Sequence, residues 1–228
     1  MKICLVSSGT LKAFKERDEG ISSSCLDVAE EGRTDLICFG FNGIGEVSYE
    51  KELKGESRFF EDAAALSKET GSVVVCGCLT DSRGLKRKSA LVAENGRLAG
   101  ISDMLYVVDG EVSCGAALRV YETKIGKMGI AVAEDLHFPD VVKSLALCGS
   151  DFIVCPFGCM RDEMQGVLLR AYAYTYGVPI VCCGQGYAMI VDGNGKMTFA
   201  ASWSPAVIEF ENRREYHLLQ TRRRLMRD

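Results

Sequence analysis

The stretch from Gly129 to Asp140, GIAVAEDLHFPD, decides the fold of this chain. It predicts a strand that runs into a sharp turn and then into a helix. Glu134, Asp135 and His137 gather at the turn. Turns of this kind aim a side chain and backbone N–H groups outward, which suits a nucleophile and an oxyanion hole. The plainer interpretation is an elbow held together by hydrogen bonds to buried carboxylates.

Strand and helix patterns alternate on both sides of this stretch, which is typical of an α/β protein. Two hairpin signals, Asn95-Gly96 and Asp192–Gly195, fall among these units, so we expect mixed sheets and one domain over residues 1–228. Besides the elbow, we expect strands at 2–7, 35–39, 72–79, 89–94, 97–101, 118–122, 151–154, 179–183, 188–191, 197–201 and 206–210, and helices at 21–31, 59–69, 141–147 and 161–176.

Composition excludes several classes of protein. The chain has 228 residues, of which 47% are hydrophobic, and its net charge is -4, so it is neither disordered nor a basic nucleic-acid binder. No apolar run is long enough to cross a membrane, and the amino terminus MKICLVSSGT resembles a first strand rather than a leader. Most of the eleven cysteines lie in apolar runs, which favours reduced thiols and a cytoplasmic location.

The residue patterns predict no metal and no cofactor. Cys76 and Cys78 would point to opposite faces of a strand, and the sequence has no CxxC pair and only two histidines. The glycine-rich segment Phe39–Glu46 lacks the GxGxxG spacing and the lysine of a phosphate-binding loop. We therefore expect this segment to be a loop that needs positive φ angles.

Six segments together resemble the nitrilase, or carbon–nitrogen hydrolase, superfamily. The resemblance covers nearly the whole chain, and it implies an α-β-β-α sandwich of two mixed β-sheets flanked by helices. It also implies a homodimer or a higher homo-oligomer. In chain order the segments are TDLICF at 34–39, the elbow at 129–140, LALCGSDFIVCP at 145–156, RAYA at 170–173, IVDGNG at 190–195 and the arginine pair at 222–223.

The match fails at the residues that would carry the chemistry. The family uses a glutamate as general base, a lysine that stabilises the oxyanion, and a cysteine nucleophile. The corresponding positions here are Phe41, Asp103 and Ala133. Because a methyl group cannot form a thioester, the resemblance implies a catalytically inactive homologue that binds a small molecule or a protein partner.

We expect a ligand pocket lined by Phe41, Asp103, Ala133, Glu134 and Cys159. Asp103 in place of lysine reverses the local charge, which favours a cationic or polyol-like ligand over a carboxylate. An alternative is an amidase that acts on a small amide, nitrile or N-carbamoyl compound through Cys159, with Glu134 and His137 beside it. A third hypothesis is a scaffold subunit without a pocket that pairs with an active enzyme.

The oligomer interface is expected on the helices near the elbow. The segments Val141–Leu147 and Gly166–Ala173 are apolar enough for one side of each to face a partner. The arginines at 213–214 and 222–224 are interpreted as a solvated helix and a dimer-contact region rather than an anion site.

Overall fold

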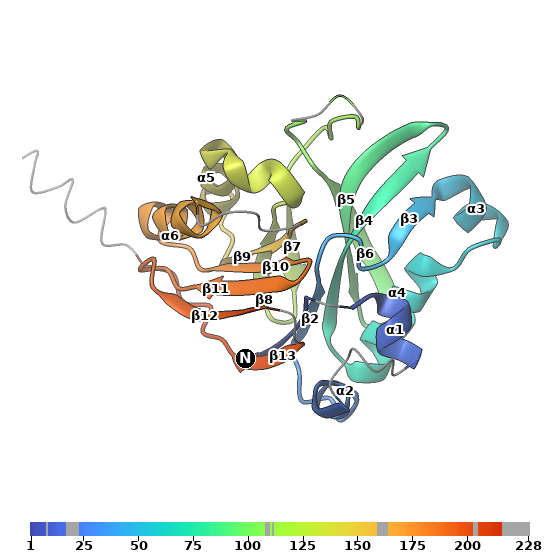
Figure 1. Ribbon diagram of the computed structural model, residues 1–228, viewed down its shortest axis with the longest axis horizontal. Coiled ribbons are helices and arrows are strands. Elements are labelled where there is room, and N and C mark those ends of the chain that lie inside the picture. The colour runs from blue at the N-terminus through green and yellow to red at the C-terminus, as the bar shows by residue number, and fades with distance from the viewer. Residues whose placement is uncertain are drawn as a thin grey trace, which may run out of the picture.

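The computed structural model describes residues 1–7, 9–16, 23–107, 110, 112–158, 164–202 and 205–215. Its strands form two sheets that face each other (Figure 1). The first sheet follows the order β13 (Ala206–Glu209), β1 (Lys2–Val6), β2 (Leu36–Phe39), β4 (Val73–Ser82), β5 (Leu85–Glu94) and β6 (Arg97–Asp103), and β3 (Gly45–Ser48) pairs with the carboxyl half of β4. The second follows the order β12 (Met197–Ser202), β11 (Tyr187–Val191), β10 (Ile180–Gly184), β9 (Phe152–Pro156), β8 (Gly126–Ile130) and β7 (Arg119–Thr123).

Helices cover the outer face of each sheet, which gives the α-β-β-α sandwich (Figure 1). Beside the first sheet lie α1 (Leu11–Glu16), α2 (Ser23–Glu30), α3 (Tyr49–Lys54) and α4 (Phe59–Thr70), and beside the second lie α5 (Pro139–Leu147) and α6 (Met164–Tyr176). Both sheets are mixed, as expected from the hairpin signals.

Buried apolar side chains form three layers. One lies between the sheets, where Leu5 and Val75 meet Ile130 and Val154. The other two lie between each sheet and its helices. The central strands are buried on both faces, which is why their sequences are continuous apolar runs such as LICF in β2.

The carboxyl ends of the parallel strands in both sheets lie at the same edge of the molecule. β2 runs parallel to β1 and β4, and β9 runs parallel to β8 and β10. Across the sheets, the Phe41 N–H donates to the Phe157 carbonyl at 2.8 Å, and the Gly186 N–H donates to the Ser7 carbonyl at 2.7 Å. Loops that leave the carboxyl ends of both sets of strands therefore meet, and this edge is where α/β sheets place their sites.

Turns occur where glycine and asparagine in the sequence predict them. Asn95 and Gly96 have φ angles of 51° and 77°, so the predicted hairpin turn between β5 and β6 is present. Asn42 and Gly45 have φ angles of 69° and 90°, in the loop for which positive angles were expected. In the described part of the chain, no helix is both long enough and apolar enough to span a membrane.

Candidate functional site at the elbow

The elbow has the geometry that its sequence predicts. β8 ends at Ile130, residues 133–137 form a 3₁₀ turn (η1, Ala133–His137), and α5 begins at Pro139. Ala133 has a φ angle of 48° and is 1% exposed. This left-handed conformation is unfavourable for a residue with a Cβ, and such strain gathers at functional turns.

Phe41 stands at the carboxyl end of β2, opposite the elbow. It packs against the layer between the sheets, to which Ala133 also belongs. The backbone at Phe41 lies very close to β4, since a Cβ added to Gly77 would sit 2.6 Å from the Phe41 Cα. The carboxyl end of β2 therefore presents an aromatic ring that is held against the core.

A lysine–glutamate pair joins the two sheets beside Phe41 and Ala133. The Lys88 ammonium on β5 donates to Glu134 Oε1 at 2.9 Å. The Lys88 and Glu134 side chains are only 17% and 29% exposed, and the Lys88 Nζ lies 6.0 Å from the centre of the Phe41 ring. The site thus contains a lysine ammonium and a glutamate carboxylate that are paired with each other.

Asp103 lies on the other face of the first sheet. Ser89 donates a hydrogen bond to Asp103 Oδ1 at 2.7 Å, and the Arg87 Nε lies 3.9 Å from Asp103 Oδ2. Successive residues of a strand point to opposite faces, so Ser89 and Lys88 point apart. The structure therefore does not bring Asp103 together with Lys88 and Glu134, whereas Phe41, Ala133 and Glu134 do lie together.

The alternative mechanism also uses His137 and Cys159, of which the structure describes only His137. His137 is exposed, its ring lies edge-on 6.0 Å from the Phe157 ring, and its carbonyl accepts a hydrogen bond from the Tyr172 hydroxyl. Cys159 lies outside the described residues.

Asp135 anchors the segment that follows β6 to the elbow. Its two carboxylate oxygens accept hydrogen bonds from the Leu105 and Tyr106 backbone N–H groups at 2.9 Å, and its side chain is fully buried. Burial raises the pKa of Asp135 to about 6, and the nearby Glu134 charge acts in the same direction. Tyr106 also stacks on Phe138 with ring centres 4.2 Å apart, so the contact is both polar and aromatic.

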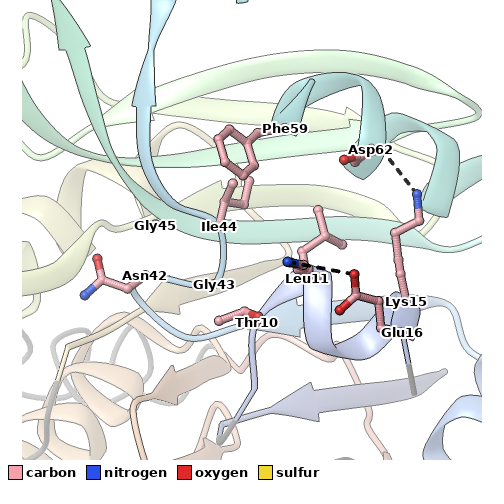
Figure 2. Close-up of a pocket in the computed structure, with 11 residues that line it drawn as sticks. Thr10, Leu11, Lys15, Glu16, Asn42, Gly43, Ile44, Gly45, Phe59 and Asp62 are labelled. Atoms are coloured by element: carbon pink, nitrogen blue, oxygen red, sulfur yellow. Dashed lines mark hydrogen bonds and ion pairs between the residues drawn. The ribbon is translucent and has the colours of Figure 1, made fainter. Parts of the chain in front are cut away.

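Two of the hollows among the described residues lie near the loop that follows β2. A small one of about 170 Å³ borders Phe41 and is lined by Ser7, Gly40 and Gln185 among others. A larger one of about 530 Å³ lies between α1, the loop after β2 and α4, with Leu11, Ile44 and Phe59 around it and the Lys15–Asp62 ion pair at its rim (Figure 2). No cluster of three or more histidine, cysteine, aspartate or glutamate side chains that could hold a metal occurs in the described ranges.

The fold and the site together define a class of protein. Its members are α-β-β-α sandwiches with a strand–turn–helix elbow at the carboxyl edge of the second sheet. Residues 18–215 match the family model described as carbon-nitrogen hydrolase. Because this match covers most of the 228 residues, the chain belongs to the carbon-nitrogen hydrolase family.

Individual relatives are distant. A Schizosaccharomyces pombe protein named "Probable nitrilase" is 22% identical over 182 residues, which is 72% of this chain and 67% of the relative. The human deaminated glutathione amidase is 32% identical over 99 residues, which is 37% of this chain and 30% of the relative. A solved cysteine-to-alanine mutant of the Nesterenkonia AN1 amidase has a TM-score of 0.76 at 17% identity, with 99% of this chain and 95% of that chain covered. At this identity the structural match supports the fold alone.

Lys88 is the site residue that sequence reasoning missed. It precedes the Asn95-Gly96 hairpin, whereas the family lysine follows it, so comparison by position selects Asp103. A usable signal exists in the strand itself, because Lys88, Ala90 and Val92 alternate with Ser89 and Leu91. Ala90 and Val92 belong to the layer between the sheets, and Lys88 shares their face.

Proposed function

We propose that this member of the carbon-nitrogen hydrolase family binds a small molecule at its elbow and does not cleave it through a thioester. The observation that carries the proposal is Ala133, which occupies the strained, buried position at the start of the turn. A methyl group offers no lone pair for attack and no proton for transfer, so covalent catalysis cannot start there.

The surroundings of Ala133 support the same proposal. Phe41 replaces the general base with a ring that cannot accept a proton, and Asp103 lies on the outer face of the sheet. The Lys88–Glu134 pair keeps both charges at the edge, but each charge is engaged by the other at 2.9 Å. A paired, partly buried ammonium and carboxylate are suited to orienting a ligand.

The test is an ammonia-release assay on a panel of small amides, nitriles and N-carbamoyl compounds. An amidase with known activity on a primary amide provides a positive control, and heat-treated protein provides the background. We expect no release above the background at any pH from 5 to 9. Reproducible turnover by the untreated chain would refute the proposal.

The same preparation tests the alternative through Cys159. Thiolate reactivity follows a lowered pKa, so an activated nucleophile would be alkylated first at neutral pH. Brief iodoacetamide treatment followed by peptide mapping ranks the eleven cysteines by rate. We expect Cys159 to react no faster than the exposed Cys114 and Cys148. Selective labelling of Cys159 together with turnover would instead establish the relocated mechanism.

We also infer a homodimer in a reducing, cytoplasmic setting. Apolar side chains stand exposed on the helices outside the second sheet, with Leu147 at 77% and Val167 at 52% exposure. In the described part of the chain, six buried cysteines form no disulfide: Cys38, Cys76, Cys78, Cys155, Cys182 and Cys183. Reduced thiols used as small core residues fit such a compartment.

A further inference from the structure

The larger hollow, between α1, the loop after β2 and α4, has an apolar floor. Leu11 and Ile44 are 3% and 8% exposed, and Phe59 lies partly buried beside them (Figure 2). The volume of about 530 Å³ is typical of small-molecule sites, which are mostly apolar and contain a few polar groups. Apolar surface that is left in water is unfavourable, so a ligand that covers this floor with an apolar group is stabilised there.

Two interactions hold the walls of this hollow together. The Leu11 N–H donates to the Gly43 carbonyl at 2.7 Å, which joins α1 to the loop after β2. Lys15 on α1 and Asp62 on α4 form an ion pair at 3.3 Å, which connects the two helices across the rim (Figure 2). The hollow is therefore formed before a ligand arrives, which lowers the cost of binding.

The charged groups around the hollow neutralise one another. The Lys15 ammonium pairs with Asp62, and the Lys12 Nζ lies 3.9 Å from Glu16 Oε1. Two ammonium groups are thus balanced by two carboxylates. A charged ligand would lose its hydration here without gaining an uncompensated partner. The rim therefore favours an uncharged ligand.

Uncharged polar side chains stand where the larger hollow meets the smaller one. Thr10 and Asn42 line both hollows. The Thr10 Oγ1 already accepts the Ala13 N–H at 3.2 Å, whereas Asn42 is exposed. An asparagine amide both donates and accepts, so it can bind a hydroxyl or another amide. Asn42 therefore provides one uncharged hydrogen-bonding group at the end of an apolar hollow.

We propose that the larger hollow is a second binding site, which takes an uncharged small molecule with an apolar group and one hydroxyl or amide group. The apolar group contacts Leu11, Ile44 and Phe59, and the polar group binds the Asn42 amide. The inference goes beyond the proposed function, because this site lies between α1 and α4 and not at the elbow.

Matched probes of one size separate the effect of charge from that of shape. The full chain is titrated with benzyl alcohol, benzoate and benzylammonium and followed by nuclear magnetic resonance of its methyl groups. We expect benzyl alcohol to bind at least ten-fold more tightly than either charged probe and to shift the methyl signals of Leu11 and Ile44. Binding of a charged probe within ten-fold of benzyl alcohol would overturn the proposal. So would the absence of saturable binding, or binding that shifts the Ala133 methyl signal instead.

Two neighbouring phenylalanines test the apolar floor. Phe59→Ala should weaken the binding of benzyl alcohol at least five-fold, because it removes one side of the hollow. Phe60→Ala is the matched control, since Phe60 is the next residue of α4 and is also partly buried, but is not among the residues that line the hollow. It should change the affinity by less than two-fold. Equal affinities of the two variants would overturn the proposal.

Asn42→Gly tests the polar group. Asn42 has a φ angle of 69°, which glycine adopts readily, so this variant keeps the loop and removes the amide. We expect it to bind benzyl alcohol at least three-fold more weakly and to bind toluene, which has no hydroxyl, as the wild type does. Asn95→Gly is the control, since Asn95 has a φ angle of 51° in the hairpin between β5 and β6, and it should change neither affinity. Unchanged binding of benzyl alcohol by Asn42→Gly, or equal losses for both probes, would overturn the proposal.

Discussion

Ala133 has a backbone conformation that suits a nucleophile elbow, although its side chain cannot serve as one. Its φ angle of 48° lies in the left-handed region, where a Cβ approaches the following carbonyl. The buried position leaves little room for a larger side chain, since Ala133 is 1% exposed. The strain therefore persists because the strand and helix on either side fix the turn.

Substitutions at Ala133 should separate the effect of backbone strain on stability from the effect of side-chain packing. Ala133→Val places a β-branched side chain in a left-handed, buried position, and we expect the free energy of unfolding to fall by about 2–3 kcal/mol. Ala133→Gly removes the strain but also a buried methyl, so we expect a change within about 1 kcal/mol. Urea denaturation of both variants measures the difference. Equal stability of the two variants would show that the turn is not held in this conformation.

At the residue scale, the sequence predicts the elbow but not the composition of the site. The elbow follows from local pattern, because apolar, acidic and Phe-Pro residues succeed one another within GIAVAEDLHFPD. The Lys88–Glu134 pair depends on how two sheets stack, and its members are 46 positions apart. Positional comparison therefore leads to Asp103, which shares a sheet with Lys88 but faces the opposite way.

At the element scale, Asp135 joins the elbow to the segment that follows β6. Its carboxylate accepts the Leu105 and Tyr106 N–H groups. Since burial raises the pKa of Asp135 from 3.8 to about 6, the native state binds this proton more tightly than the unfolded state does. The contribution of Asp135 to the free energy of unfolding is thus greatest below pH 4 and declines as the pH rises through 6.

Asp135→Asn should remove this pH dependence. Between pH 4 and pH 7, the stability of the wild type relative to Asp135→Asn should fall by about 2–3 kcal/mol. Urea denaturation at several pH values gives both curves. Asp140→Asn replaces an exposed carboxylate one turn later and should follow the wild type. Parallel curves for the wild type and Asp135→Asn would contradict the assignment.

The close approach of β4 to the loop after β2 depends on glycine. We expect Gly77→Ala to lower the free energy of unfolding by about 2 kcal/mol or more, because the added methyl would lie 2.6 Å from the Phe41 Cα, which cannot swing away as a side chain could. Thermal denaturation measures the loss. Gly110→Ala is the control, since an added Cβ there meets nothing within 4 Å. Equal melting temperatures for the two variants would show that the loop can move aside.

At the element scale, the sequence predicts most strands and the long helices, because burial on both faces leaves continuous apolar runs. The hairpin turns follow from Asn95-Gly96 and from Gly195, whose φ angle is 74°. The missed elements are α1, β3 and α3, which contain 6, 4 and 6 residues. Elements this short carry little periodic signal, and β3 is specified by its pairing with β4 rather than by its own residues.

The two outer faces of the molecule differ in their exposed apolar side chains. On α6, Met164, Val167 and Tyr174 are 58%, 52% and 48% exposed and lie at helical spacing. Leu147 at the end of α5 is 77% exposed, and α5 packs against α6. Exposed apolar residues that gather on packed helices are typical of an interaction surface, whereas single ones are ordinary.

If this surface joins two copies of the chain, charges placed on it should separate them. We expect the wild type to have twice the 24.9 kDa mass of one chain in light scattering at micromolar concentration, and Leu147→Glu/Val167→Glu to have the mass of one. Leu53→Glu is the matched control, since Leu53 is 88% exposed on α3, beside the other sheet. It should keep the dimer mass, because a carboxylate there meets only water. A monomeric wild type, or a dimer lost equally in Leu53→Glu, would refute assembly through α5 and α6. Circular dichroism of all variants confirms that a change in mass reflects the interface and not unfolding.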